Sequence, residues 1–132
     1  MWGNYAGGYL WFVAVSGFIL FGLPLCFFPL RWARMLCWRI PDDTSLVIYL
    51  GRCLGVIICV VSFFATRVTH DAGVLPFFFD FMLVNFAAMI VVHLYGALRR
   101  IQPWTETAEI LFWFVQLLAT LCFHPGSGVL GL

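Results

Sequence analysis

The sequence predicts an all-α membrane protein, a polytopic four-helix bundle, from its composition and from four long apolar segments. Of its 132 residues, 64% are hydrophobic and 10% are charged, whereas soluble domains carry about 25% charged residues. So few charged side chains cannot cover a surface in water, and lipid must therefore surround the molecule. Each apolar segment is close to the ~20 residues that a helix needs to cross a hydrocarbon core of ~30 Å. In lipid the backbone must satisfy its own hydrogen bonds, so we expect all four segments to be helical.

We expect the crossings at residues 9–30, 46–65, 74–98 and 107–123, within a single transmembrane domain over residues 1–132. None of the four runs shows the two-residue alternation that is typical of a strand. The first run lacks a preceding basic region and a small-residue cleavage site. We therefore expect it to be retained rather than removed as a signal peptide.

Proline and capping residues mark the expected helix ends. Pro24 should kink the first helix, because a proline cannot donate a backbone hydrogen bond. The polar run at residues 41–45 can cap the second helix. Before the fourth helix, Pro103 breaks the chain, and Thr105 is expected to cap the helix with Glu106 in its first turn.

The arginines predict the orientation in the membrane. Five lie on one predicted side: Arg31, Arg34, Arg39, Arg99 and Arg100. The other side holds only Arg67, so the positive-inside rule places both termini on the non-cytoplasmic side. Residues 30–40 should lie along the cytoplasmic interface as a short amphipathic stretch. Short loops and the absence of lysine favour a bacterial inner membrane.

Three ionisable residues fall at a similar depth in three different helices. They are Arg52, His93 and Glu109, with Glu106 one turn before Glu109. A charged side chain inside a membrane costs about 2.5–3.5 kcal/mol on insertion scales, so such groups turn toward one another. We therefore expect an inward-facing polar cluster of these residues, in which Glu109 or Glu106 balances Arg52.

The helix faces support this convergence. A stripe of small and polar residues on the second helix marks a packing side: Gly51, Arg52, Gly55, Cys59, Ser62 and Thr66. Asn85 shares a face with His93, and Gln116 shares one with Glu109, so both are expected deeper in the cluster. At the outer rim, Asp80 can pair with Arg67. The cluster is either a structural salt bridge that fixes helix pairing, or a site for a polar head group or for a proton on His93.

No catalytic, metal or cofactor motif is visible in the sequence. The five cysteines are scattered without a CxxC pair, so neither a disulfide nor a metal site is expected. His70 and His124 lie at the outer boundary, where they cannot sandwich a haem between facing helices. Net charge is +1, which leaves no basic face for nucleic acid.

Part of the chain resembles a known family. The segments concerned are Leu23-Pro24 and Phe28-Pro29, the basic linker after them, and residues 50–55 (Leu-Gly-Arg-Cys-Leu-Gly). Over roughly the first half of the chain they resemble the DoxX-like group of small four-helix membrane proteins. The resemblance implies a four-helix bundle, sometimes an accessory component of a membrane redox or quinone-linked system. It carries over no catalytic residue.

These observations favour a non-enzymatic accessory or assembly subunit of a larger membrane complex, in contact with membrane lipids and with other membrane protein subunits. The alternative is a binder or carrier of a lipophilic small molecule such as a quinone, whose polar head would meet Arg52, His93 and Glu109. A third possibility is a quinone-linked enzyme subunit. The sequence identifies neither the ligand nor the partner.

Overall fold

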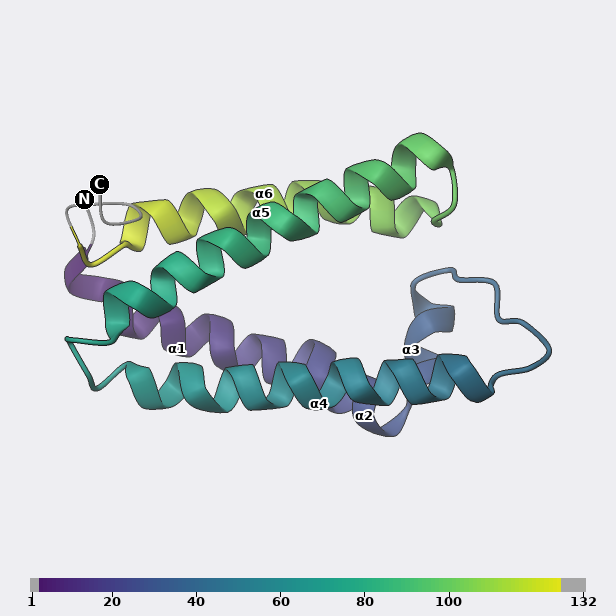
Figure 1. Cartoon of the computed structure of the whole chain (residues 1–132), viewed down its shortest axis with the longest axis horizontal. Helices are drawn as coiled ribbons and strands as arrows, with labels where there is room; N and C mark the ends of the chain where they lie inside the picture. The colour runs from purple at the N-terminus through teal and green to yellow at the C-terminus, as the bar shows by residue number, and fades with distance from the viewer. Residues whose placement is uncertain (1–2, 127–132) are drawn as a thin grey trace. The chain divides into compact units, whose positions relative to one another are not determined.

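The structure, a computed structural model, describes residues 3–126, and this part of the chain is all-α (Figure 1). Four helices are long and apolar enough to cross a membrane: Gly3–Phe27, Ser45–Val68, Leu75–Arg99 and Trp104–Phe123. The predicted fold class is therefore confirmed. The first span begins and ends earlier than expected, and the fourth begins three residues before the predicted residue 107.

The chain forms two compact units. One unit comprises residues 1–9 and 68–132; within it α5 (Leu75–Arg99) and α6 (Trp104–Phe123) lie side by side as an antiparallel hairpin (Figure 1). The other unit comprises residues 10–67. The expected single four-helix domain stays a prediction.

The second unit holds most of the first span, which is an irregular helix. It runs through α1 (Ala6–Gly17), the π-helical turn η2 (Phe18–Gly22) and α2 (Leu23–Phe27). The short helix α3 (Pro29–Met35) follows, and α4 (Ser45–Val68) forms the second span. The irregularity expected at Pro24 lies in the turn before it. Pro24 cannot donate to the carbonyl of Leu20, and the indole Nε1 of Trp32 donates to that oxygen instead, at 3.1 Å.

Glycines on α4 let the preceding segments pack closely against it. A Cβ built on Gly55 would lie 2.6 Å from the backbone nitrogen of Cys26. One built on Gly51 would lie 2.7 Å from the Cβ of Pro29. These contacts leave no room for a methyl group, so this part of the small-residue stripe is a helix-packing face, as the sequence predicts.

The first unit has its core where the first turns of α1 meet the α5–α6 hairpin. Phe79 and Thr120 are fully buried. The ring of Tyr9 stacks on Phe123, with centroids 4.8 Å apart, and lies 5.9 Å from the ring of Phe79. The Tyr9 hydroxyl and the Thr120 Oγ1 are 2.8 Å apart and share a hydrogen bond. Tyr9 therefore fixes the start of α1 to this end of the hairpin.

The polar run before α4 caps that helix through Asp43. Its Oδ1 accepts a hydrogen bond from the backbone N–H of Ser45, at 2.9 Å. Hydrogen bonds from the backbone and the side chain of Ser45 hold the pKa of Asp43 below its usual value, because they favour the ionised carboxylate.

Gly55→Ala is expected to destabilise the protein by about 1–3 kcal/mol, because the new methyl group would meet backbone atoms of Cys26 that cannot move independently. Gly17→Ala is the matched control, since its Cβ would sit 3.7 Å from the Ser62 hydroxyl, an ordinary contact. Thermal unfolding of the two variants in detergent, followed by circular dichroism, measures the difference. Equal stability of the two would refute close packing at Gly55.

Asp43→Ala is expected to lower the unfolding temperature near neutral pH but not in acid. A pKa lowered by folding gives stability that is present above the unfolded-state pKa and lost as the pH falls through the folded-state pKa. Unfolding curves from about pH 7 to about pH 2 measure this dependence. Asp42→Ala is the control, and a loss in that variant as large as in Asp43→Ala would contradict the assignment of the cap.

Candidate cation-binding site

His93 lies on α5, six residues before the helix ends at Arg99, and it is only 5% exposed. Its Nδ1 is 2.8 Å from the backbone oxygen of Met89, one turn earlier. A carbonyl oxygen can only accept, so Nδ1 carries the hydrogen of this bond. In the neutral ring the other nitrogen, Nε2, is then an unprotonated lone pair.

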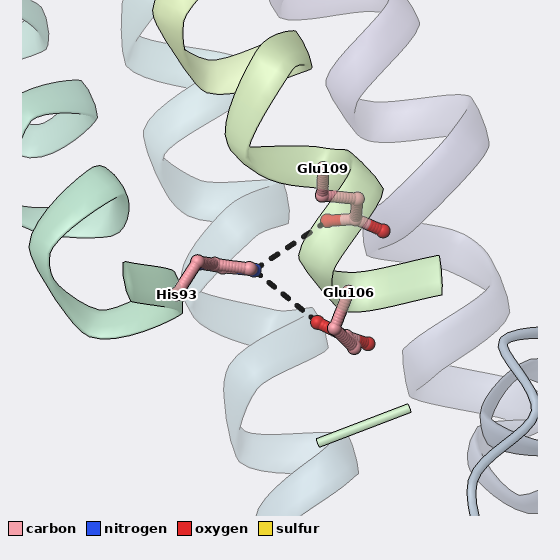
Figure 2. A group of neighbouring side chains, drawn as sticks. All are labelled: His93, Glu106 and Glu109. Atoms are coloured by element: carbon pink, nitrogen blue, oxygen red, sulfur yellow. Dashed lines mark ion pairs between the residues drawn. The ribbon is translucent and has the colours of Figure 1, made fainter. Parts of the chain in front are cut away.

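Two carboxylates of α6 face this nitrogen, as Figure 2 shows. The His93 Nε2 lies 3.2 Å from the Oε2 of Glu106 and 3.7 Å from the Oε2 of Glu109. One ligand atom from each of the three side chains lies within 4.8 Å of the other two. The Glu106 and Glu109 side chains are 14% and 19% exposed, so the group is largely buried but reachable from outside. We call His93, Glu106 and Glu109 the His93 cluster.

The start of α6 brings both glutamates to His93. Pro103 occupies the N-cap position with an extended backbone, at φ −67° and ψ 164°, and the helix begins at Trp104. The expectation that Thr105 caps the helix is therefore wrong. The ring of Pro103 already fixes the entering backbone, and Thr105 lies inside the first turn. Glu106 is in the first turn as predicted, and Glu109 follows three residues later on the same face.

The short connection between α5 and α6 sets the register of the hairpin. Arg100 ends α5 in the left-handed conformation, at φ 54° and ψ 36°. Gln102 then folds back, and its Nε2 donates to the backbone oxygen of His93 at 3.1 Å and to the Thr107 Oγ1 at 3.2 Å. Gly96 provides the space, because a Cβ there would overlap the Gln102 side-chain amide. Gln102 therefore joins the backbone that carries His93 to the first turn of α6.

Trp113 lies beside the His93 cluster, one turn after Glu109 on α6. Its ring is 5.9 Å from the ring of His93 and 5.8 Å from that of Phe86. The indole Nε1 is buried and has no hydrogen bond of regular geometry among the described residues. It lies near the Glu109 carboxylate and makes a weak hydrogen-bonding contact with it. The indole N–H of Trp113 is therefore a buried donor beside the cluster, and it could donate a hydrogen bond to an additional oxygen atom there.

The structure brings some of the predicted site residues together and leaves others apart. His93, Glu109 and Glu106 meet, and Glu106 is the nearer of the two acids. Asn85 is exposed on α5. Arg52 belongs to the other unit, so its expected pairing with the glutamates stays a prediction.

Gln116 belongs to a separate polar group farther along α6. Its backbone oxygen and its Oε1 accept from the Tyr9 hydroxyl, at 3.3 and 3.2 Å. The Thr120 Oγ1 also donates to the backbone oxygen of Gln116, at 2.8 Å. Gln116 thus helps to hold Tyr9, at the start of α1, against the hairpin.

A second histidine–carboxylate pair lies at the opposite end of the hairpin. The Nε2 of His124 is 3.1 Å from the Oδ1 of Asp80, and His124 is 6% exposed. The Nδ1 of His124 lies 3.1 Å from the backbone nitrogen and 3.3 Å from the backbone oxygen of Gly126, so it has a hydrogen-bond partner in either tautomer. The expected pairing of Asp80 with Arg67 joins residues of different units and stays a prediction.

Sequence reasoning missed two residues that shape the site. Trp113 is absent from the predicted site, although it follows Glu109 by four residues and so shares its helix face. Gln102 is also absent, and its contact with the His93 backbone is visible only in the structure. The spacing Glu106, Glu109, Trp113 was the one available signal for a common face.

Comparison with known protein families, with characterised proteins and with solved structures finds no match to this chain. The resemblance to DoxX-like proteins stays a prediction.

Gly96→Ala is expected to destabilise the protein by about 1 kcal/mol by displacing Gln102 and its two hydrogen bonds. In a Gln102→Ala background the same change should be neutral or stabilising, because only the better helix propensity of alanine remains. Unfolding free energies of the two single variants and the double variant test this sign change. The same effect of Gly96→Ala in both backgrounds would show that Gln102 does not fill this space.

Proposed function

We propose that this membrane protein binds a cation, either a proton or a metal ion, at the His93 cluster. One observation carries the proposal: the hydrogen bond from the His93 Nδ1 to the Met89 carbonyl turns the Nε2 lone pair toward two carboxylates. Three electron-rich atoms that approach one another in a poorly solvated place repel unless a positive charge lies among them. A bound cation would remove this repulsion and stabilise the cluster.

The site lies at the end of the hairpin where the chain turns from α5 into α6. Arg99 and Arg100 follow at that end, and the positive-inside rule makes it the cytoplasmic end, with both termini on the opposite side of a bacterial inner membrane. The partial exposure of Glu106 and Glu109 supports access from this side. We propose that cations exchange between the cluster and the cytoplasmic water.

The sequence still favours an accessory subunit of a larger membrane complex, because it shows no recognisable catalytic motif. The cation site would then serve that complex. Binding the polar head of a lipophilic molecule such as a quinone would need Arg52 beside the cluster. The geometry within the α5–α6 hairpin supports the cation more directly, because all three ligand atoms belong to one compact unit.

The proposal predicts that cations stabilise the wild-type protein and not the variant Glu106→Gln/Glu109→Gln, which keeps the side-chain volume but loses the charge. Thermal unfolding of untagged protein in detergent would be measured from about pH 5 to pH 8 and with Na⁺, K⁺, Mg²⁺, Ca²⁺, Mn²⁺, Co²⁺ and Zn²⁺. A cation at a hundred times its Kd should add about 2.7 kcal/mol.

Asp80→Asn is the matched control, because it removes a carboxylate from the other histidine pair of the same hairpin. This variant should keep the cation response of the wild type. If neither protons nor any of these ions distinguishes the wild type from the double glutamine variant, the proposed function is wrong.

A further inference from the structure

Two distances within the His93 cluster match the separations of ligand atoms around a small metal ion, and the two carboxylate oxygens lie within 4.8 Å of each other. A metal–nitrogen or metal–oxygen bond of about 2.0–2.2 Å at tetrahedral angles puts neighbouring ligand atoms roughly 3.3–3.6 Å apart. The His93 Nε2 lies 3.2 Å and 3.7 Å from the two carboxylate oxygens. An ion could therefore bind with only small side-chain movements.

The surroundings of His93 are those of a metal ligand. A ligating imidazole almost always donates its second N–H to a carbonyl or carboxylate, which fixes the tautomer and the ring orientation. The bond from the His93 Nδ1 to the Met89 oxygen does this at 2.8 Å. The ring is held further by the Trp113 indole, 5.9 Å away. The nitrogen that faces the glutamates is thus prepared as a donor atom.

We propose that the His93 cluster binds one divalent first-row transition-metal ion of the Mn²⁺-to-Zn²⁺ series, through Nε2 of His93 and one oxygen each of Glu106 and Glu109. This inference rests on the proposed function and names its cation. Two carboxylates balance the charge of a divalent ion. An imidazole nitrogen beside carboxylate oxygens suits these ions better than Mg²⁺ or Ca²⁺, which prefer oxygen alone.

The indole N–H of Trp113 can bind a further oxygen atom at this site. Three protein ligands leave a fourth position for water or for an exchangeable group. The buried indole Nε1 makes only a weak contact with Glu109 and can donate to an oxygen bound at this position, or more fully to Glu109 once the ion has drawn its other oxygen away. Trp113 is a positioning residue that acts through the bound oxygen rather than on the ion.

Titration of untagged, chelator-stripped protein in detergent with Co²⁺ tests the proposal, because cobalt at such a site gives visible absorption bands. We expect saturation at one Co²⁺ per chain and loss of the bands when Zn²⁺ is added. His93→Gln and Glu109→Gln should abolish the bands, while Trp113→Phe should weaken affinity about 10–100-fold and shift them.

His124→Gln and Asp80→Asn are the controls, since they alter the other histidine–carboxylate pair, and both should bind cobalt like the wild type. Circular dichroism shows that each variant is folded before its titration is read. Failure to saturate, or equal binding by wild type and Glu109→Gln, would overturn the metal assignment.

The two proposals can fail separately. If protons, Na⁺, K⁺, Mg²⁺ or Ca²⁺ stabilise the wild type but not Glu106→Gln/Glu109→Gln, while Co²⁺ and Zn²⁺ do not, the proposed function stands and the transition-metal inference is wrong. If no cation and no proton distinguishes the two proteins, both are wrong.

Discussion

The hydrogen bond between His93 and the backbone of Met89 is the interaction on which the candidate site depends. It holds the imidazole on the packed face of α5 and decides which nitrogen meets α6. In an apolar helix the ring has few other partners, so the local carbonyl sets its chemistry. With the tautomer fixed in this way, the positions of Glu106 and Glu109 determine what the cluster can hold.

Those positions follow from the short connection between α5 and α6. Pro103 starts α6 without a side-chain cap, which places Glu106 in the first turn and Glu109 in the second. Gly96 admits the Gln102 side chain, and Gln102 bonds both to the carbonyl of His93 and to Thr107. Gly96 and the Gln102 amide thereby help to fix the register of α5 and α6. The His93 cluster is not the only contact that sets this register.

The sequence predicted the helices well and the site in part, for physical reasons. Long apolar runs in lipid leave the backbone no alternative to a helix, so the crossings follow from composition. The proximity of His93 and Glu109 follows from their similar distances, six and five residues, from the ends of α5 and α6 at the same connection. The sequence could not show that Glu106 lies nearer than Glu109, nor that Gln116 bonds to Tyr9. Both depend on side-chain directions that are set by packing rather than by spacing.

The two histidine–carboxylate groups of the hairpin differ in the number of carboxylates that face the ring. His124 meets the backbone of Gly126 at Nδ1, and its Nε2 faces one carboxylate, that of Asp80. His93 donates from Nδ1 to Met89, and its Nε2 then faces carboxylates that have no hydrogen to offer when they are ionised. A single carboxylate therefore gives an ordinary ion pair at one end of the hairpin, whereas two carboxylates give three converging ligand atoms at the other. The proposed cation rests on this difference.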